Sequence, residues 1–161
     1  MNRLIIFLLT FSLAVSVKGQ LSSHEMQQLV LKKNIVDSLF VFGKWTAEGS
    51  EESHFMYLGK VVTKDRQVLK IMTSCWFWGL SHRATCTILI FNEKNQPLGN
   101  YNGLMIYELP DKLENGKLIF LNTDKECLSI TTTIDFGNGI PEHIFIKCKE
   151  DYGNEYTFSH D

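Results

Sequence analysis

Beyond about residue 38 the chain alternates between apolar and polar positions, and turn-forming residues interrupt the alternation roughly every ten positions. Segments of this kind, rich in Val, Ile, Thr and aromatic residues, are typical of β-strands. The connections between them are too short for crossover helices, so neighbouring strands are expected to pair antiparallel. We predict strands near residues 39–47, 55–63, 67–78, 83–91, 98–109, 117–122, 127–135, 142–149 and 155–159.

The start of the chain has a different pattern. A basic residue and a short apolar run, from Leu4 to Val15, precede small residues that end at Gly19. This arrangement is typical of a secretory signal peptide, and the run is too short for a membrane-spanning helix. We therefore expect residues 1–19 to be removed before Gln20, and residues 20–161 to form a single domain that is secreted or periplasmic.

One helix is predicted before the strands. Ser22 as N-cap and Glu25 three residues later match the capping-box pattern, and good helix formers follow them. We expect a helix from about Ser23 to Lys33, or as far as Val36.

Four cysteines in an exported chain predict two disulfides. Placing Cys75 opposite Cys86 on paired strands collects apolar side chains on one face and most polar side chains on the other. A slip of one residue would destroy that separation, because successive side chains point to opposite faces. The strand pattern therefore predicts a Cys75–Cys86 disulfide.

The second cysteine pair is also placed symmetrically. Cys127 and Cys148 are equidistant from the turn at residues 137–138, which predicts a hairpin closed by a Cys127–Cys148 disulfide. A bulge near Gly139 would be needed to keep the apolar residues of this hairpin on one face. The alternative is that the cysteines are buried free thiols, which behave as small hydrophobic residues.

Eight or nine antiparallel strands must close into a barrel or divide into the two sheets of a sandwich to protect their edges. Gly43-x-Trp45, just after the predicted helix, resembles the opening motif of lipocalins and of bacterial lipocalin-like domains. Thr123-Asp124 lies near the place where lipocalins carry a Thr-Asp-Tyr motif, with Lys125 in place of the Tyr. The C-terminal helix of that family and its Arg near the last strand have no counterpart in this chain.

This resemblance implies an antiparallel up-and-down β-barrel in which Gly43 and Trp45 are structural residues and the Trp packs across the closed end. It also implies an apolar cup for one small hydrophobic ligand, the space that eight strands enclose. A two-sheet β-sandwich is the alternative fold. The strand register gives the inward positions that would line part of the cup: Ile71, Phe77, Ile88 and Ile90.

The most unusual local feature is Trp76-Phe77-Trp78 at the end of a predicted strand. Phe77 points inward in the register above, so Trp76 and Trp78 share the opposite face. Exposed tryptophans on one face would offer a contact surface for a sugar ring or a protein partner. The alternative is that the helix or a second layer covers this face.

Composition and motifs exclude several function classes. The net charge is −2 without a Lys/Arg block, which gives no footprint for nucleic acid and no anchor for a membrane surface. The five histidines lack metal-site spacing, no Cys-x-x-Cys is present, and no cofactor motif occurs. We read His143 as a surface residue or a partner of Thr132, and the acids in turns, such as Glu108, as solvated.

These observations predict a secreted, non-catalytic binding protein that holds a small hydrophobic ligand in a barrel. The alternative is a secreted module that contacts a protein or a carbohydrate through the aromatic surface around Trp76 and Trp78. A hydrolase with an unrecognised site is the third hypothesis. No nucleophile motif supports it, but a catalytic triad can form in space without such a motif.

Overall fold

The computed structural model describes residues 21–122, 127, 131–149 and 152–160. The predicted signal peptide and Thr123-Asp124 lie outside the described residues. The described chain is mostly antiparallel β-structure with one α-helix, followed along the sequence by eleven strands and a short 3₁₀ helix. No helix in these ranges has the length and apolarity needed to cross a membrane.

The helix α1 (Ser23–Lys33) forms where the capping pattern predicts it. The Ser22 backbone N–H donates to Glu25 Oε2 (2.7 Å), and the Glu25 backbone N–H donates to Ser22 Oγ (3.3 Å). The helix ends before Val36 because Asn34 takes a left-handed conformation and its N–H donates to the Val30 carbonyl (3.2 Å). Three apolar residues of α1 are buried against the sheet: Met26, Val30 and Leu31.

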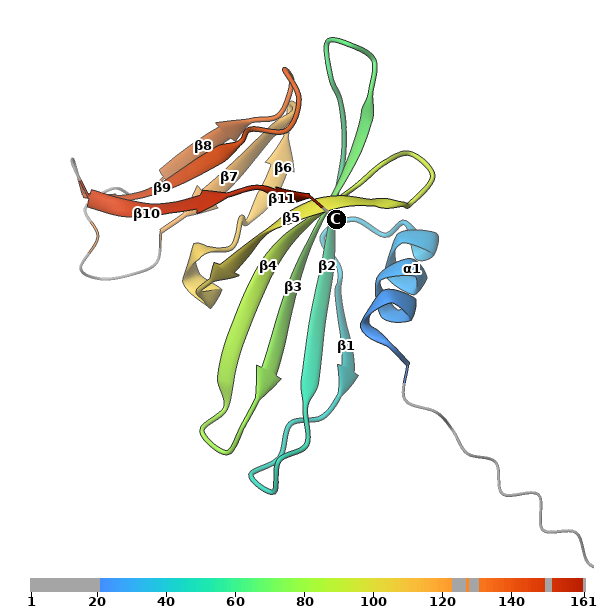
Figure 1. Ribbon diagram of the computed structural model, residues 1–161, viewed down its shortest axis with the longest axis vertical. Helices are drawn as coiled ribbons and strands as arrows, with labels where there is room; N and C mark the ends of the chain where they lie inside the picture. The colour runs from blue at the N-terminus through green and yellow to red at the C-terminus, as the bar shows by residue number, and fades with distance from the viewer. Residues whose placement is uncertain (1–20, 123–126, 128–130, 150–151, 161) are drawn as a thin grey trace, which may run out of the picture.

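Six strands form the main sheet, which runs the length of the molecule (Figure 1). Their order is β1–β2–β3–β4–β5–β11, and all pairs are antiparallel. Their bounds are Leu39–Gly43, Glu52–Val62, Val68–Trp78, Arg83–Phe91, Pro97–Leu104 and Ser159–His160.

The pairing of β3 with β4 confirms the predicted register. Cys75 lies opposite Cys86 and Ile71 opposite Ile90, and the Cys75–Cys86 disulfide is present. The apolar face of this pair belongs to the main core, where Cys86 and Ile71 are both 0% exposed. The alternation of apolar and polar side chains therefore predicted both the strand register and the disulfide correctly.

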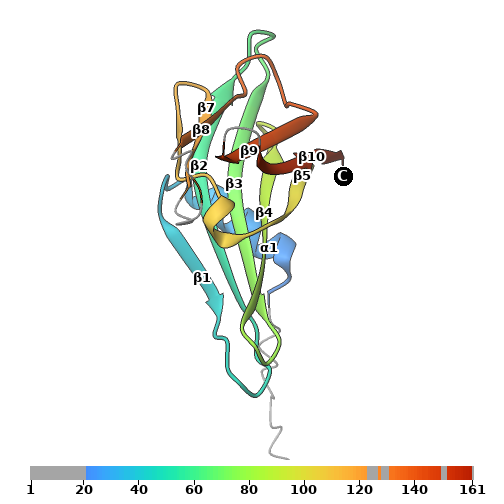
Figure 2. The same ribbon diagram turned by 90° about the vertical axis from the view of Figure 1, so that its left-hand side faces the viewer.

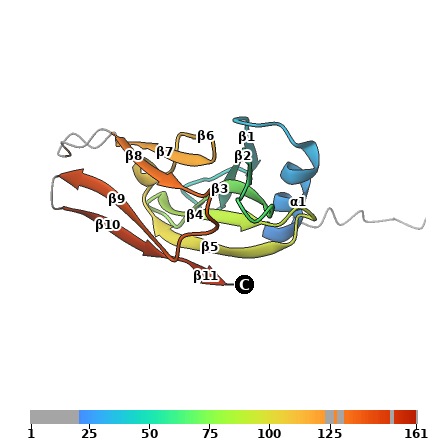
Figure 3. The ribbon, with the colours of Figure 1, turned by 90° about the horizontal axis from the view of Figure 1, so that it is seen from above.

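Two smaller sheets cover this apolar face (Figures 2 and 3). One has the order β6–β7–β8 (Lys112–Glu114, Lys117–Leu121 and Thr131–Asp135), and the other pairs β9 (His143–Lys149) with β10 (Tyr152–Thr157). The main core lies between them and the main sheet, whereas α1 covers the opposite face (Figure 3). The described sheets do not close on themselves, because β1 and β11 end the main sheet without pairing with each other.

The hairpin expected around residues 137–138 is wrong. β8 pairs with β7 and β9 pairs with β10 in separate sheets. Cys127 and Cys148 are joined by a disulfide, but no ladder pairs β8 with β9 among the described residues. The turn leads from one small sheet to the other because Phe136, which is 0% exposed, is buried in the main core and its N–H donates to the Gly116 carbonyl (2.9 Å).

Several strand boundaries also differ from the prediction, most clearly at the ends of two strands. β1 ends at Gly43, and β5 ends at Leu104, after which Ile106–Glu108 form a 3₁₀ helix. Glu108 explains the second difference, because its carboxylate turns back to accept a hydrogen bond from the Met105 N–H (2.8 Å).

Candidate ligand-binding site

The helix α1 covers only the middle of one sheet face, and a hollow lies beside each of its ends. The hollow beside the N-terminal end, which we call the tryptophan groove, has a volume of about 420 Å³. The hollow beside the C-terminal end, which we call the lysine pocket, has a volume of about 490 Å³. Both volumes lie in the range of small-molecule sites, roughly 300–1,000 Å³.

The tryptophan groove lies between the start of α1 and strands β2 and β3. Trp76 forms one wall, and Phe55 lies among the buried residues beneath α1. The remaining lining is mixed and comes from three segments of the chain. Leu21 and Met26 are apolar, and the polar lining residues are Ser23, Glu51, Ser53 and Ser74. The groove therefore combines an aromatic side chain with hydroxyl and carboxylate groups.

Trp76 is held in place but remains accessible. Its side chain is 41% exposed, and its ring stacks on that of Trp78 with 5.5 Å between centroids and 23° between planes. Trp76 Nε1 donates to Glu51 Oε2 (3.1 Å), and Trp78 Nε1 donates to Thr85 Oγ1 (3.2 Å). Because residues 74, 76 and 78 follow one another on the same face of β3, Trp78 flanks Trp76 on one side and the groove lies on the other.

The stack is completed by a cation. The Arg83 guanidinium carbon lies 5.6 Å from the centroid of the Trp78 ring, within the range of a cation–π contact. Arg83 lies directly opposite Trp78 on β4. The two tryptophans are thus ordered, before any ligand arrives, by neighbours on β4 and in the loop before β2.

A second aromatic cluster closes the end of the main core nearby. Trp45 Nε1 donates to the Gly79 carbonyl (2.8 Å), and its ring lies 4.3 Å from that of His82, which in turn lies 5.0 Å from Phe77. His54 contacts Phe77 from β2 at 4.6 Å. Trp45 therefore covers the sheet end above Phe77 through His82.

Glu52 ties this cluster together electrostatically. Its Oε1 lies 2.5 Å from His54 Nε2, and its Oε2 accepts a hydrogen bond from the Trp45 N–H (3.1 Å). These two hydrogen bonds, together with the nearby His54 and His82, hold the pKa of the Glu52 carboxyl below its usual value. Within the described ranges, no three His, Cys, Asp or Glu side chains are grouped so that they could hold a metal ion.

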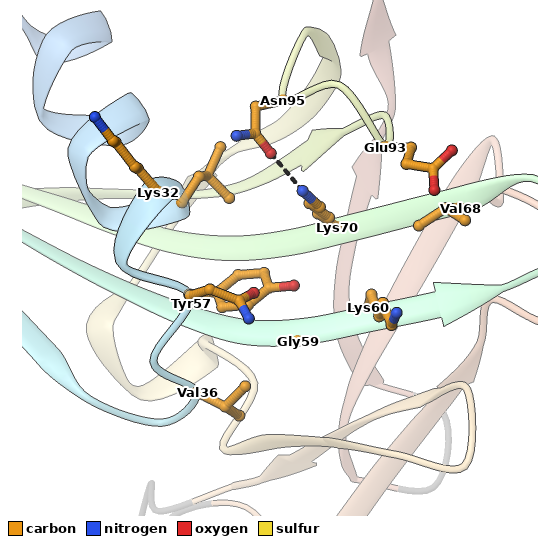
Figure 4. A pocket seen from close by; sticks show the side chains of 11 residues that line it. Lys32, Val36, Tyr57, Gly59, Lys60, Val68, Lys70, Glu93 and Asn95 are labelled. Atoms are coloured by element: carbon orange, nitrogen blue, oxygen red, sulfur yellow. Dashed lines mark hydrogen bonds between the residues drawn. The ribbon is translucent and has the colours of Figure 1, made fainter.

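Figure 4 shows the lysine pocket, where α1, β2, β3 and the loop between β4 and β5 meet. Three lysines and one carboxylate line it, together with the Tyr57 side chain and two asparagines. Lys70 Nζ donates to Asn95 Oδ1 (2.5 Å), and the Asn95 carbonyl accepts from Gln28 Nε2 (2.8 Å) on α1. The polar lining residues are Lys32, Asn34, Tyr57, Lys60, Lys70, Glu93 and Asn95.

A third small hollow, of about 130 Å³, lies beside the Cys127–Cys148 disulfide and contains Glu108. Glu108 is not a solvated turn residue as expected, since it is only 4% exposed. Its carboxylate accepts hydrogen bonds from the Tyr156 hydroxyl (2.5 Å) and Asn154 Nδ2 (2.5 Å) as well as from the Met105 N–H. This set of donors gives Glu108 a structural role, in which it fixes the 3₁₀ helix against β10.

The predicted site residues fall into two groups. Ile71, Ile88 and Ile90 are each 0% exposed and Phe77 is 9% exposed, and all four are packed in the main core. The tryptophans Trp76 and Trp78 lie on the opposite face, as the register predicts.

Two further expectations can be compared with the structure. His143 is exposed, but Thr157, not Thr132, lies within hydrogen-bond distance of its Nδ1 (3.1 Å). The lysine pocket was not predicted, although Gly59 inside a strand pattern is a recognised signal for a bulge.

Comparisons with protein-family models, with curated proteins and with solved structures gave no match to the chain.

Proposed function

We propose that this protein is an exported, non-catalytic binding protein that recognises a carbohydrate in the tryptophan groove. Export is supported by the two disulfides, because such bonds persist in oxidising extracellular or periplasmic compartments. The sequence pattern of residues 1–19 supports the same compartment.

The observation that carries the proposal is the exposed, pre-ordered Trp76 at the wall of a hydroxyl-lined groove. A sugar ring has an apolar C–H face and a rim of hydroxyls, so its recognition requires an aromatic plane beside hydrogen-bonding groups. Trp76 supplies the plane, and Ser23, Ser53 and Ser74 supply hydroxyls that both donate and accept. Because Trp76 is already stacked on Trp78, little side-chain entropy is lost when the ligand binds.

A small hydrophobic ligand inside a lipocalin-like barrel is the second candidate. It is favoured by Trp45, which lies across one end of the main core as the Trp of the family does across the closed end of its barrel. This candidate requires space where Ile71, Ile88 and Ile90 now pack without exposure. The groove requires no such rearrangement, so we rank the carbohydrate first.

The test is binding of the purified protein to an array of glycans and to soluble polysaccharides in affinity electrophoresis. We expect retention by at least one glycan and a loss of about 30-fold in affinity on Trp76→Ala, since central tryptophans in interfaces contribute roughly 2 kcal/mol or more. Tyr152→Ala is the matched control, because Tyr152 is an aromatic residue that is 63% exposed on β10, outside the groove.

Two results would overturn the carbohydrate proposal. One is the absence of any retained glycan with the folded wild-type protein. The other is an equal loss of affinity in Trp76→Ala and Tyr152→Ala, which would mean that exposed aromatic surface in general, and not the groove, causes retention.

A further inference from the structure

The lysine pocket brings like charges together on neighbouring strands. Lys60 on β2 lies directly opposite Lys70 on β3 in the ladder. Like charges in such a cross-strand pair are destabilising, whereas an opposite charge between them would be stabilised by both. The pair is therefore arranged for an anion rather than for the stability of the sheet.

A β-bulge creates this arrangement. The ladder between β2 and β3 shifts register between Tyr57 and Gly59, where Gly59 takes a φ of +122°. Strict alternation would place residues 57 and 60 on opposite faces, but the extra residue brings Tyr57 and Lys60 to the same face. Bulges of this kind often redirect a side chain next to a functional site.

Tyr57 directs an unpaired hydroxyl into the pocket. The side chain is only 2% exposed and its ring packs in the cluster beneath α1. Among the described residues the hydroxyl has no hydrogen-bond partner, and Figure 4 shows it pointing into the hollow between Lys70 and Lys60. The hydroxyl is accessible from the hollow although the rest of the side chain is buried, so it can donate a hydrogen bond to a ligand there. Burial raises the pKa of Tyr57, which keeps this donor protonated at neutral pH.

The charge of the pocket is opposite to that of the whole chain. Lys32, Lys60 and Lys70 face a single carboxylate, that of Glu93, in a protein whose net charge is −2. Lys32 lies in the last turn of α1, where it offsets the negative end of the helix dipole. This leaves Lys60 and Lys70, the latter positioned by Asn95, to attract a ligand.

Part of the wall is apolar. Leu31 of α1, Val36 after it and Val68 of β3 line the hollow beside the polar groups. A bare inorganic ion would leave most of the volume of about 490 Å³ unfilled. An anion that carries a hydrocarbon body would fill it and bury apolar surface.

We propose that the lysine pocket binds a small organic acid, with its anionic oxygens on the Tyr57 hydroxyl, Lys60 and Lys70 and its apolar body against Leu31 and Val68. The site shares no residue with the tryptophan groove, so this proposal and the carbohydrate proposal can fail separately.

The test uses titration calorimetry of the whole exported chain with three probes: octanoate, octan-1-ol and inorganic phosphate. Octanoate is expected to bind, and to bind less tightly as salt screens the lysines. Octan-1-ol lacks the charge and phosphate lacks the apolar body, so each is expected to bind at least about tenfold more weakly.

Variants separate the pocket from general charge effects. Tyr57→Phe removes only the hydroxyl and should weaken octanoate binding about tenfold, as expected for a hydrogen bond to a charged group. Lys60→Gln should weaken it about fivefold. Lys33→Gln is the matched control, because Lys33 is an exposed lysine of α1 that does not line the pocket, and it should leave the affinity unchanged.

Four outcomes would overturn the proposal. The first is no octanoate binding up to about 10 mM, beyond the weakest affinities of practical meaning. The second is equal binding of octan-1-ol, which would indicate a merely apolar hollow, and the third is equal binding of phosphate, which would indicate an ion site alone. The fourth is an equal effect of Lys33→Gln and Lys60→Gln, which would assign the affinity to overall charge.

Discussion

Two buried tyrosines and one partly buried tyrosine differ in what their hydroxyls contact, and this difference gives a quantitative prediction for Tyr→Phe substitutions. The Tyr57 hydroxyl has no partner among the described residues, the Tyr101 hydroxyl donates to the Pro141 carbonyl (2.5 Å), and the Tyr156 hydroxyl donates to the buried Glu108 carboxylate (2.5 Å). The ring stays in place in each variant, so only the hydrogen bond changes.

The free-energy losses follow from those partners. Tyr57→Phe should change the free energy of unfolding by less than about 0.5 kcal/mol, as for a substitution that breaks no contact. Tyr101→Phe should cost about 1–2 kcal/mol, because it removes a neutral hydrogen bond and leaves a carbonyl unpaired. Tyr156→Phe should cost about 2–3 kcal/mol, because the acceptor is a carboxylate that is only 4% exposed.

Urea unfolding followed by tryptophan fluorescence measures all three values, provided that the slope m is the same as for wild type. The ranking of the three losses in unfolding free energy tests the reasoning more sharply than any single value. If Tyr57→Phe destabilised the protein as much as Tyr101→Phe, the Tyr57 hydroxyl would have a partner in the free protein. The lysine pocket would then lose the donor on which its proposed ligand depends.

Three further predictions concern the fold. The double variant Cys75→Ala/Cys86→Ala should lower the free energy of unfolding by about 3 kcal/mol, because the disulfide closes a loop with a sequence separation of 11; a loss below about 1 kcal/mol in urea unfolding would contradict this. Glu52→Gln should lower the melting temperature at neutral pH, because the His54 hydrogen bond lowers the pKa of the Glu52 carboxyl in the folded state and so stabilises the fold while the carboxyl is ionised. Wild type loses this stabilisation on acidification below about pH 4, so the difference between the two proteins should shrink there. A difference in melting temperature that persists unchanged at lower pH would contradict this pH dependence. Gly99→Ala should cost about 2–3 kcal/mol, because φ is +147° and a Cβ would lie 2.2 Å from a backbone carbonyl oxygen of β11; urea unfolding identical to wild type would show that β11 does not pack there.

The main sheet could be predicted from the sequence where side-chain alternation is regular. Around Cys75 and Cys86 the apolar residues separate cleanly onto one face, so a single register satisfies the pattern, and that register is observed. The helix was predictable for a local reason, the capping box of Ser22 and Glu25. In both cases the decisive interactions lie within a few residues or within one hairpin.

Prediction fails where pairing depends on distant parts of the chain. The symmetry of Cys127 and Cys148 about a turn indicates the disulfide correctly but the wrong ladder, because burial of Phe136 in the main core directs β8 and β9 into different sheets. The lysine pocket was missed because of a local irregularity in a strand. Counting by alternation separates Tyr57 from Lys60, and only the bulge at Gly59 unites them.

The position of α1 has a consequence for how the two hollows behave together. The same helix contributes Ser23 and Met26 to one and Leu31 and Lys32 to the other, so it is a shared wall. A ligand that tilts or shifts α1 over the apolar residues of the sheet beneath it alters both cavities at once. Thermodynamic reciprocity then requires that the proposed acid at one end and the proposed sugar at the other change each other's dissociation constant by the same factor.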